Sequence, residues 1–164
     1  MNPETLITAL NTQGVKYVIV GGFAAVLQGA RYVTYDVDFC YARDEDNLTR
    51  LFRALEPFHP VIRANPDVPF DLAALRASPD FSLDTDVGEL DLLAHIDGLG
   101  DYAEVARHAE VFHVRGQPCP VLSLEALIVT KSVLQRRKDV QLLEELRALA
   151  ALRRKVRDQG VSDQ

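Results

Sequence analysis

The stretch that decides the fold runs from Val20-Gly21-Gly22-Phe23 to Asp36-Val37-Asp38. The apolar run before it, residues 16–20, predicts a buried strand that ends at the double glycine and leads into a short helix from about Phe23. Residues 35–41 predict a second strand, in which successive side chains point to opposite faces. Asp36 and Asp38 therefore share one face of this strand, and its apolar side chains share the other.

Two carboxylates on one face of an apolar strand are costly to bury, because ionised carboxylates repel each other and lose water. A divalent metal ion between them offsets both costs. The Gly-Gly turn would let backbone approach a ligand with no Cβ in the way, and the helix after it would direct free N–H groups at an anion. Together they are typical of phosphoryl transfer, although each alone is also compatible with a solvated strand face and an ordinary turn.

A third carboxylate is expected on a strand predicted from Glu89 to Ile96. The face that contains Leu90 and Leu92 is apolar, and Asp91 lies on the opposite face together with His95. Asp91 is therefore a further candidate metal ligand, and pairing with an arginine is the alternative.

Composition indicates an ordinary globular protein. The 164 residues predict one domain with a real core. The formal net charge of −6 argues against a broad nucleic-acid-binding surface. The first residues are polar and acidic, which is unlike a signal peptide, and no apolar run is long enough to span a membrane. Cys40 and Cys119 lack metal-site spacing and indicate reduced thiols, so we expect a cytoplasmic protein.

The remaining patterns predict an α/β (α+β) fold, in which helices flank a twisted mixed β-sheet and the C-terminal helices pack on it. Capping residues mark several helix starts, namely Asn2, Asp44 and Ser123. The other elements are expected as strands at 61–63 and 81–85, a hairpin at 110–122, and helices at 72–75, 101–109 and about 138–157.

The motif Val20-Gly21-Gly22-Phe23-Ala24, then Arg31-x-x-Thr34-x-Asp36-Val37-Asp38, then a strand with Asp91, resembles the nucleotidyltransferase superfamily of the DNA polymerase β type. The likeness is closer to small bacterial nucleotidyltransferase-like proteins related to the AbiEii-type toxins of toxin–antitoxin systems. Residues 123–131 and Lys138-Asp139 also resemble that group. The resemblance implies a single nucleotidyltransferase-like domain over residues 1–158, with a frayed tail at 159–164.

The resemblance also implies a role for each carboxylate. Asp36 and Asp38 match the pair that binds two Mg²⁺ ions, for which Mn²⁺ could substitute. Asp91 matches the third carboxylate, which shares a metal ion and helps to deprotonate the attacking hydroxyl. All three are therefore expected to be both catalytic residues and metal ligands.

Four further residues are expected to bind the nucleotide. Gly21 and Gly22 match the turn that faces the phosphates, Thr34 lies just before the acidic pair, and Lys131 matches a lysine that meets the triphosphate. Two departures stand out. The superfamily often has Ser at the position of Gly22, and the related proteins commonly have Gly-Arg-Pro-Lys-Asp at residues 135–139, where this chain has Gln-Arg-Arg-Lys-Asp.

The resemblance therefore predicts metal-dependent transfer of a nucleoside monophosphate from a nucleoside triphosphate to a hydroxyl acceptor, which could be RNA, protein or a small molecule. The alternative is a catalytically inactive nucleotidyltransferase-fold binding module or a toxin–antitoxin component. In that case Arg31, Arg63 or Lys131 would form salt bridges to the three carboxylates. Metal-dependent phosphate-ester hydrolysis is a weaker alternative.

The expected partners follow from the same resemblance and from one further pattern. Besides the nucleoside triphosphate and the hydroxyl acceptor, an antitoxin is a possible partner. A leucine stripe over residues 142–152 is typical of a core-facing helix or of an oligomer seam, so a homodimer is also possible. No membrane partner is expected.

Overall fold

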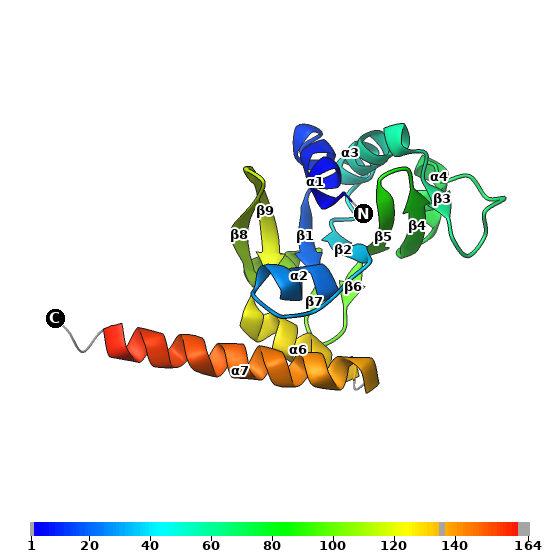
Figure 1. Ribbon diagram of the computed structural model, residues 1–164. Coiled ribbons are helices and arrows are strands. Elements are labelled where there is room, and N and C mark those ends of the chain that lie inside the picture. The colour runs from blue at the N-terminus through cyan, green and yellow to red at the C-terminus, as the bar shows by residue number, and fades with distance from the viewer. Residues whose placement is uncertain (1, 135–136, 161–164) are drawn as a thin grey trace.

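A seven-stranded mixed sheet lies at the centre of the protein, in the strand order β3-β4-β5-β2-β1-β9-β8. The computed structural model describes residues 2–134 and 137–160 (Figure 1). Residues His95–Ile96 (β6) and Gly100–Asp101 (β7) form a separate two-stranded ribbon. The strands of the main sheet are β1 (Tyr17–Val20), β2 (Asp36–Tyr41), β3 (Val61–Ile62), β4 (Phe81–Thr85), β5 (Gly88–Leu93), β8 (Ala109–Val114) and β9 (Gln117–Leu122).

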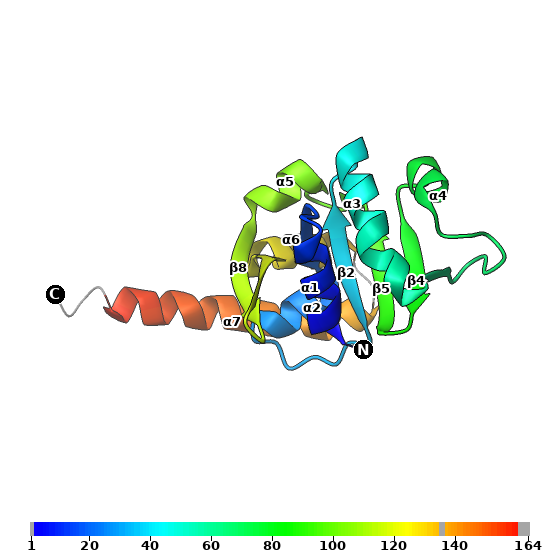
Figure 2. The same cartoon turned by 90° about the horizontal axis from the view of Figure 1, so that it is seen from above.

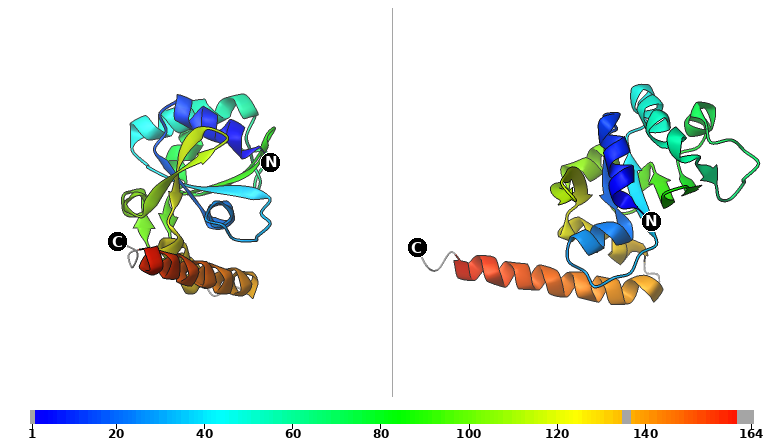
Figure 3. Two further views of the ribbon diagram at one scale, coloured as in Figure 1. Left: turned by 60° about the vertical axis from the view of Figure 1, so that its left-hand side comes forward. Right: turned by 45° about the horizontal axis from the view of Figure 1, so that its top comes forward.

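The helices lie on both sides of this sheet, as the sequence predicted. Figures 1 and 3 show α1 and α3 together on one side of the molecule and α6 and α7 on the opposite side. The C-terminal part of α7 extends past the other elements (Figure 2), and residues 151–159 are all exposed. The helices are α1 (Pro3–Thr12), α2 (Gly21–Leu27), α3 (Glu45–Leu55), the 3₁₀ helix η1 (Glu56–Phe58), α4 (Leu72–Ala77), α5 (Tyr102–Arg107), α6 (Leu124–Leu134) and α7 (Arg137–Gly160).

The central strand β2 determines where the site lies. It runs antiparallel to β1 and parallel to β5, so that Asp38 lies opposite Val20 on one side and Asp91 on the other. Val37 and Phe39 are at most 1% exposed and belong to the core. The alternation expected for this strand is therefore confirmed from Asp36 onward. Tyr35, which was expected to share the apolar face, lies before β2 and is 79% exposed.

The predicted caps are present at the helix starts. The Asn2 side chain accepts a hydrogen bond from the Thr5 N–H at 3.2 Å, and Asp44 accepts one from the Asn47 N–H at 3.1 Å. The Ser123 hydroxyl accepts from the Ala126 N–H at 3.3 Å. Each bond satisfies a backbone donor that a helix start leaves free.

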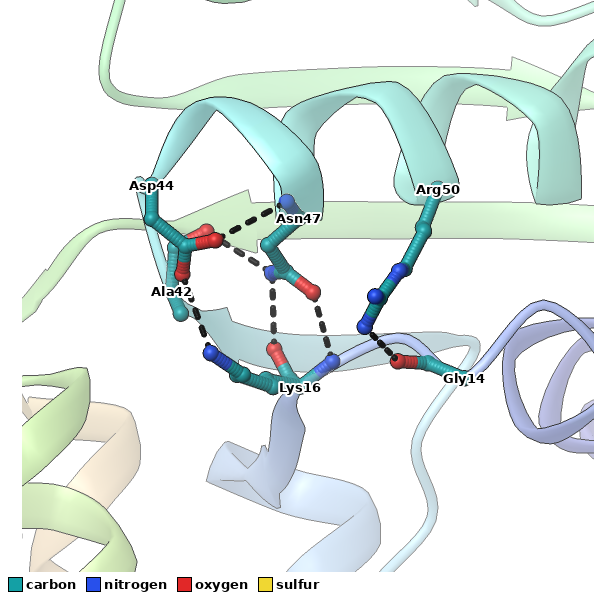
Figure 4. Close-up of polar contacts among 6 residues, drawn as sticks. All are labelled: Gly14, Lys16, Ala42, Asp44, Asn47 and Arg50. Carbon is teal, nitrogen blue, oxygen red and sulfur yellow. Dashed lines mark hydrogen bonds and ion pairs between the residues drawn. The ribbon is translucent and has the colours of Figure 1, made fainter.

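A buried amide ties α3 to two strands, which the sequence did not predict. Asn47 is 0% exposed. Its oxygen accepts from the Lys16 N–H at 2.7 Å, and its nitrogen donates to the carbonyls of Lys16 at 3.1 Å and Ala42 at 2.8 Å. Figure 4 shows this amide between the two backbone segments. Asn47 therefore fixes the start of α3 against the ends of β1 and β2.

One predicted strand is wrong in its extent. The strand expected from Glu89 to Ile96 ends at Leu93, and His95 and Ile96 belong to the separate ribbon. The reason is a side-chain contact from the start of β4, because the Ala94 N–H donates to the Asp80 carboxylate at 2.9 Å. The Asp80 side chain thus accepts the backbone hydrogen bond that the Ala94 N–H would otherwise donate to a neighbouring strand.

Several boundaries differ by a few residues. Helix α2 begins at Gly21 and not near Phe23, and α7 continues to Gly160, past the helix end expected at about 157. Residues 135, 136 and 161–164 lie outside the described part of the chain.

Cys40 and Cys119 are free and buried. Among the helices described, none is both long and apolar enough to cross a membrane.

Candidate active site

The three predicted carboxylates meet at one place. Asp36 and Asp38 are two residues apart on β2, and Asp91 is the register partner of Asp38 on the parallel strand β5. One carboxylate oxygen from each residue lies within 4.8 Å of the others. Residues that are distant in sequence are therefore gathered by strand pairing into a cluster of the size that a small cation needs.

The glycine turn between β1 and α2 lies directly against this cluster. Gly21 has a φ of +65°, and a Cβ at this position would lie 2.7 Å from the Asp38 Cγ. Both the left-handed backbone and the nearby carboxylate exclude any larger residue. The Gly22 N–H donates a hydrogen bond to Asp38. The start of α2 therefore positions the central carboxylate of the cluster.

Gly22 is needed for a different reason. A Cβ on this residue would lie 2.9 Å from Cε1 of Tyr32 and 3.0 Å from the Thr34 hydroxyl oxygen. The space that a serine side chain would occupy is thus taken by the loop before β2. This packing leaves no room at Gly22 for the Ser that the sequence resemblance would lead one to expect there.

Asp38 is the most perturbed member of the cluster. Burial, and then the charges of Asp36 and Asp91, raise the pKa of Asp38 to about 7, while Lys131 and the Gly22 N–H act in the opposite direction. A carboxylate with a raised pKa is one whose negative charge is poorly compensated. The cluster therefore favours a positive ligand.

Asp91 contributes an oxygen atom that is available to a ligand. Its Oδ1 atom is buried and has no hydrogen-bond partner within the described residues. A buried polar atom without a partner costs free energy, and such an atom at a cleft commonly serves a ligand. Three carboxylates offer the hard oxygen ligands that Mg²⁺ and Mn²⁺ prefer.

Thr34 lies at the cluster, but its described contact is to the chain itself. Its hydroxyl donates to the Asp36 Oδ1 at 2.9 Å and thereby orients that carboxylate. Thr34 also lines the cleft. Its predicted contact with a nucleotide stays a prediction.

Lys131 reaches the same cleft from α6. Its ammonium donates to Asp139 Oδ1, in the first turn of α7, at 2.8 Å. The side chains are 14% and 3% exposed. The positive charge of Lys131 lowers the pKa of Asp38. An ammonium therefore lies near the carboxylates without being bonded to them.

The salt bridges that would indicate an inactive site are absent from the described part of the chain. Arg63 pairs with Asp84 at 3.0 Å and with Glu89 at 3.2 Å, and Lys131 pairs with Asp139. No salt bridge in residues 2–134 and 137–160 joins a cation to Asp36, Asp38 or Asp91. The carboxylates are thus free to accept an external cation.

All predicted site residues line one cleft of about 490 Å³. Apart from His95, the sequence did not identify its other walls, because they come from loops and from a helix pair whose placement depends on tertiary packing. The additional lining residues with polar side chains are Tyr32, Asp80, His95, Asp97, Thr130 and Asp139. His95 is exposed and lies on the ribbon, not on the Asp91 strand as predicted.

The chain matches no protein-family model and no curated protein. Solved structures do match it. ANT(2″)-Ia in complex with adenylyl-2″-tobramycin matches with a TM-score of 0.56 and 16% identity, over 96% of this chain and 95% of that one. The lincosamide antibiotic adenylyltransferase LnuA, bound to lincomycin, gives a TM-score of 0.59 and 18% identity, over 85% and 90%.

A third match is an antigenic nucleotidyltransferase-like protein from Paracoccidioides brasiliensis, with a TM-score of 0.57 and 18% identity, over 93% of this chain and 78% of that one. The chain therefore has the nucleotidyltransferase fold, as its glycine turn and acidic pair predicted. The link to AbiEii-type toxins stays a prediction.

Proposed function

We propose that this protein is a metal-dependent nucleotidyltransferase, which moves a nucleoside monophosphate from a nucleoside triphosphate to a hydroxyl acceptor. The observation that carries the proposal is the convergence of the Asp36, Asp38 and Asp91 oxygens within 4.8 Å beside the glycine turn. The nucleotidyltransferase fold of the solved structures that match the chain supports it.

The reaction needs little covalent chemistry from the protein. The acceptor oxygen forms a bond to the α-phosphorus, the bond from that phosphorus to the bridging oxygen breaks, and pyrophosphate leaves with the electron pair. In this proposal Asp91 accepts the hydroxyl proton, the turn at Gly21 and Gly22 faces the phosphates, and Lys131 adds a point charge beside them. Thr34 keeps Asp36 in the orientation that ligation needs.

Asp36, Asp38 and Asp91 would hold the cofactor, for which Mg²⁺ is the first candidate and Mn²⁺ the second. Two such ions would activate the attacking oxygen and neutralise the departing pyrophosphate. The partnerless Asp91 Oδ1 supports this assignment.

The acceptor that fits the cleft best is a small hydroxyl-bearing molecule. Beyond the metal ligands the lining contains Asp80 and Asp97, besides the paired Lys131 and Asp139, and these acidic groups disfavour a polyanion such as RNA. Two of the matching structures hold small antibiotic ligands, adenylyl-2″-tobramycin and lincomycin. The predicted antitoxin partner and homodimer are not needed for this function and stay predictions.

Calorimetry tests the proposal directly. Mg²⁺ and each of the four ribonucleoside triphosphates are titrated into the wild type, into Asp38→Ala and into Asp84→Asn, a control in which an acidic side chain on β4 is changed outside the cluster. We expect metal-dependent triphosphate binding by the wild type and the control, and its loss in Asp38→Ala. Equal binding by all three proteins, or by none, would overturn the proposal.

A further inference from the structure

A buried ion pair joins the two C-terminal helices at the wall of the cleft. Lys131 donates to Asp139 at 2.8 Å, and Asp139 is 2% exposed. The Oδ2 atom of Asp139 is buried without a hydrogen-bond partner among the described residues. Among the described residues, the Asp139 carboxylate therefore has one hydrogen-bond partner, the Lys131 ammonium.

Stability alone gives little reason for this pair. Removing two charges from water is costly, and an apolar pair of similar size often stabilises a protein as well or better. Asp139 does have a favourable place in the first turn of α7, near the positive end of the helix dipole. An exposed carboxylate would obtain the same benefit without the cost of burial, so burial points to a role for Lys131.

The position of Lys131 suggests what that role is. Its positive charge lowers the pKa of Asp38. Its flexible four-carbon side chain could also bring the ammonium to the metal ligands. An ammonium bonded to Asp38 or Asp91 would occupy the place of a metal ion. In the structure it is bonded instead to Asp139, which also lines the cleft.

We propose that Asp139 is a positioning residue, which holds the Lys131 ammonium away from the three metal-binding carboxylates and presents it to the triphosphate. The inference rests on the proposed function, because it assumes that metal ions and a triphosphate enter this cleft. The contact between α6 and α7 would then keep the Lys131 ammonium apart from the metal ions.

A double-mutant cycle separates this role from a structural one. The variants are Asp139→Asn, Lys131→Met and the combination of both, with Glu144→Gln as the control, because it makes the same charge change at an exposed position of α7. Binding of Mn²⁺ alone and binding of ATP in the presence of Mg²⁺ are measured by calorimetry. Circular dichroism confirms that each variant is folded.

Asp139→Asn is expected to weaken Mn²⁺ binding about tenfold, as the loss of a supporting residue commonly does, because Lys131 then turns to the carboxylates. The double variant should recover the Mn²⁺ affinity of Lys131→Met, since the competing ammonium is gone. All three variants should lose ATP affinity to a similar extent, and the control should match the wild type.

Unchanged Mn²⁺ and ATP binding by Asp139→Asn would overturn the inference and leave the proposed function standing. A loss of Mn²⁺ affinity that persists in the double variant would overturn it as well, because Asp139 would then act without Lys131. If Asp139→Asn does not fold, the neutral double variant carries the same test, by comparison with Lys131→Met. A wild type that binds no Mn²⁺ would overturn both the inference and the proposed function.

Discussion

Asp38 and Asp91 are direct register partners on neighbouring parallel strands, so their side chains leave the sheet side by side. Strand pairing thus places two like charges next to each other, and Asp36 adds a third. The charges that would hold a metal ion are also those that repel each other when no ion is bound.

This repulsion predicts how stability depends on pH. The pKa of Asp38 is raised from 3.8 to about 7, so between these values the folded protein binds more protons than the unfolded chain. Stability without metal therefore falls as the pH rises from about 4 to about 7. Asp38→Asn should remove this fall and stabilise the protein at about pH 8 by on the order of 3 kcal/mol.

Urea denaturation of both proteins in the presence of a chelator, at about pH 4 and about pH 8, checks this prediction. The gain should be small at the lower pH, where Asp38 is protonated in the folded protein and still about half protonated in the unfolded chain. A variant that is less stable than the wild type at both values would show that the Asp38 charge is well compensated.

Gly21 should be needed for metal binding as well as for the backbone conformation of the turn. Gly21→Ala places a Cβ against Asp38, whereas Gly14→Ala creates similar strain, at φ +67°, with only an Arg50 nitrogen at 4.0 Å. Both variants should lose about 1 kcal/mol or more of stability. Only Gly21→Ala should also weaken Mn²⁺ binding, by about tenfold or more. Equal Mn²⁺ affinities in calorimetry would contradict this.

Serine at position 22, which the sequence resemblance would lead one to expect, should impair this protein. Gly22→Ser would press on Tyr32 and on the Thr34 hydroxyl, and the crowding should cost about 1–3 kcal/mol. Displacing Thr34 would also loosen its bond to Asp36, so Mn²⁺ affinity should fall. Combination with Thr34→Ala should recover part of the lost stability. Thermal and urea denaturation measure both variants, and a Gly22→Ser protein with improved triphosphate binding would contradict the prediction.

Asn47 should stabilise the fold without contributing to the chemistry. Asn47→Ala leaves the Lys16 N–H and the Ala42 carbonyl without their partner (Figure 4), at a cost of roughly 2–4 kcal/mol. Arg50→Ala removes a single bond of 3.3 Å to the Gly14 carbonyl and should cost less than about 1 kcal/mol. Urea denaturation compares the two. Unaltered Mn²⁺ affinity at a temperature where both variants are folded completes the test.

The parts of the fold that sequence could predict are those with local causes. The strand–turn–helix at Gly21 and the alternation in β2 follow from backbone sterics and from a period of two residues, and both are present. The gathering of Asp36, Asp38 and Asp91 also followed, once the Asp91 strand was placed in the same sheet.

The features that sequence did not predict depend on contacts between distant segments. The end of β5 depends on Asp80, which is 14 residues before Ala94. Asn47 bonds to a residue 31 positions away. The Lys131–Asp139 pair depends on how α6 and α7 pack against each other. The periodicity within either helix does not predict that packing.

The position of the acidic pair on β2 limits which mutations this protein can accumulate during evolution. A shift of the strand by one residue would turn Asp36 and Asp38 into the core and expose Phe39 to water. Mutation therefore cannot move the proposed metal ligands along the strand without disrupting the core, whereas the parts of the cleft wall that do not contact these carboxylates are less constrained. New acceptors would be acquired by replacing those walls around a fixed centre.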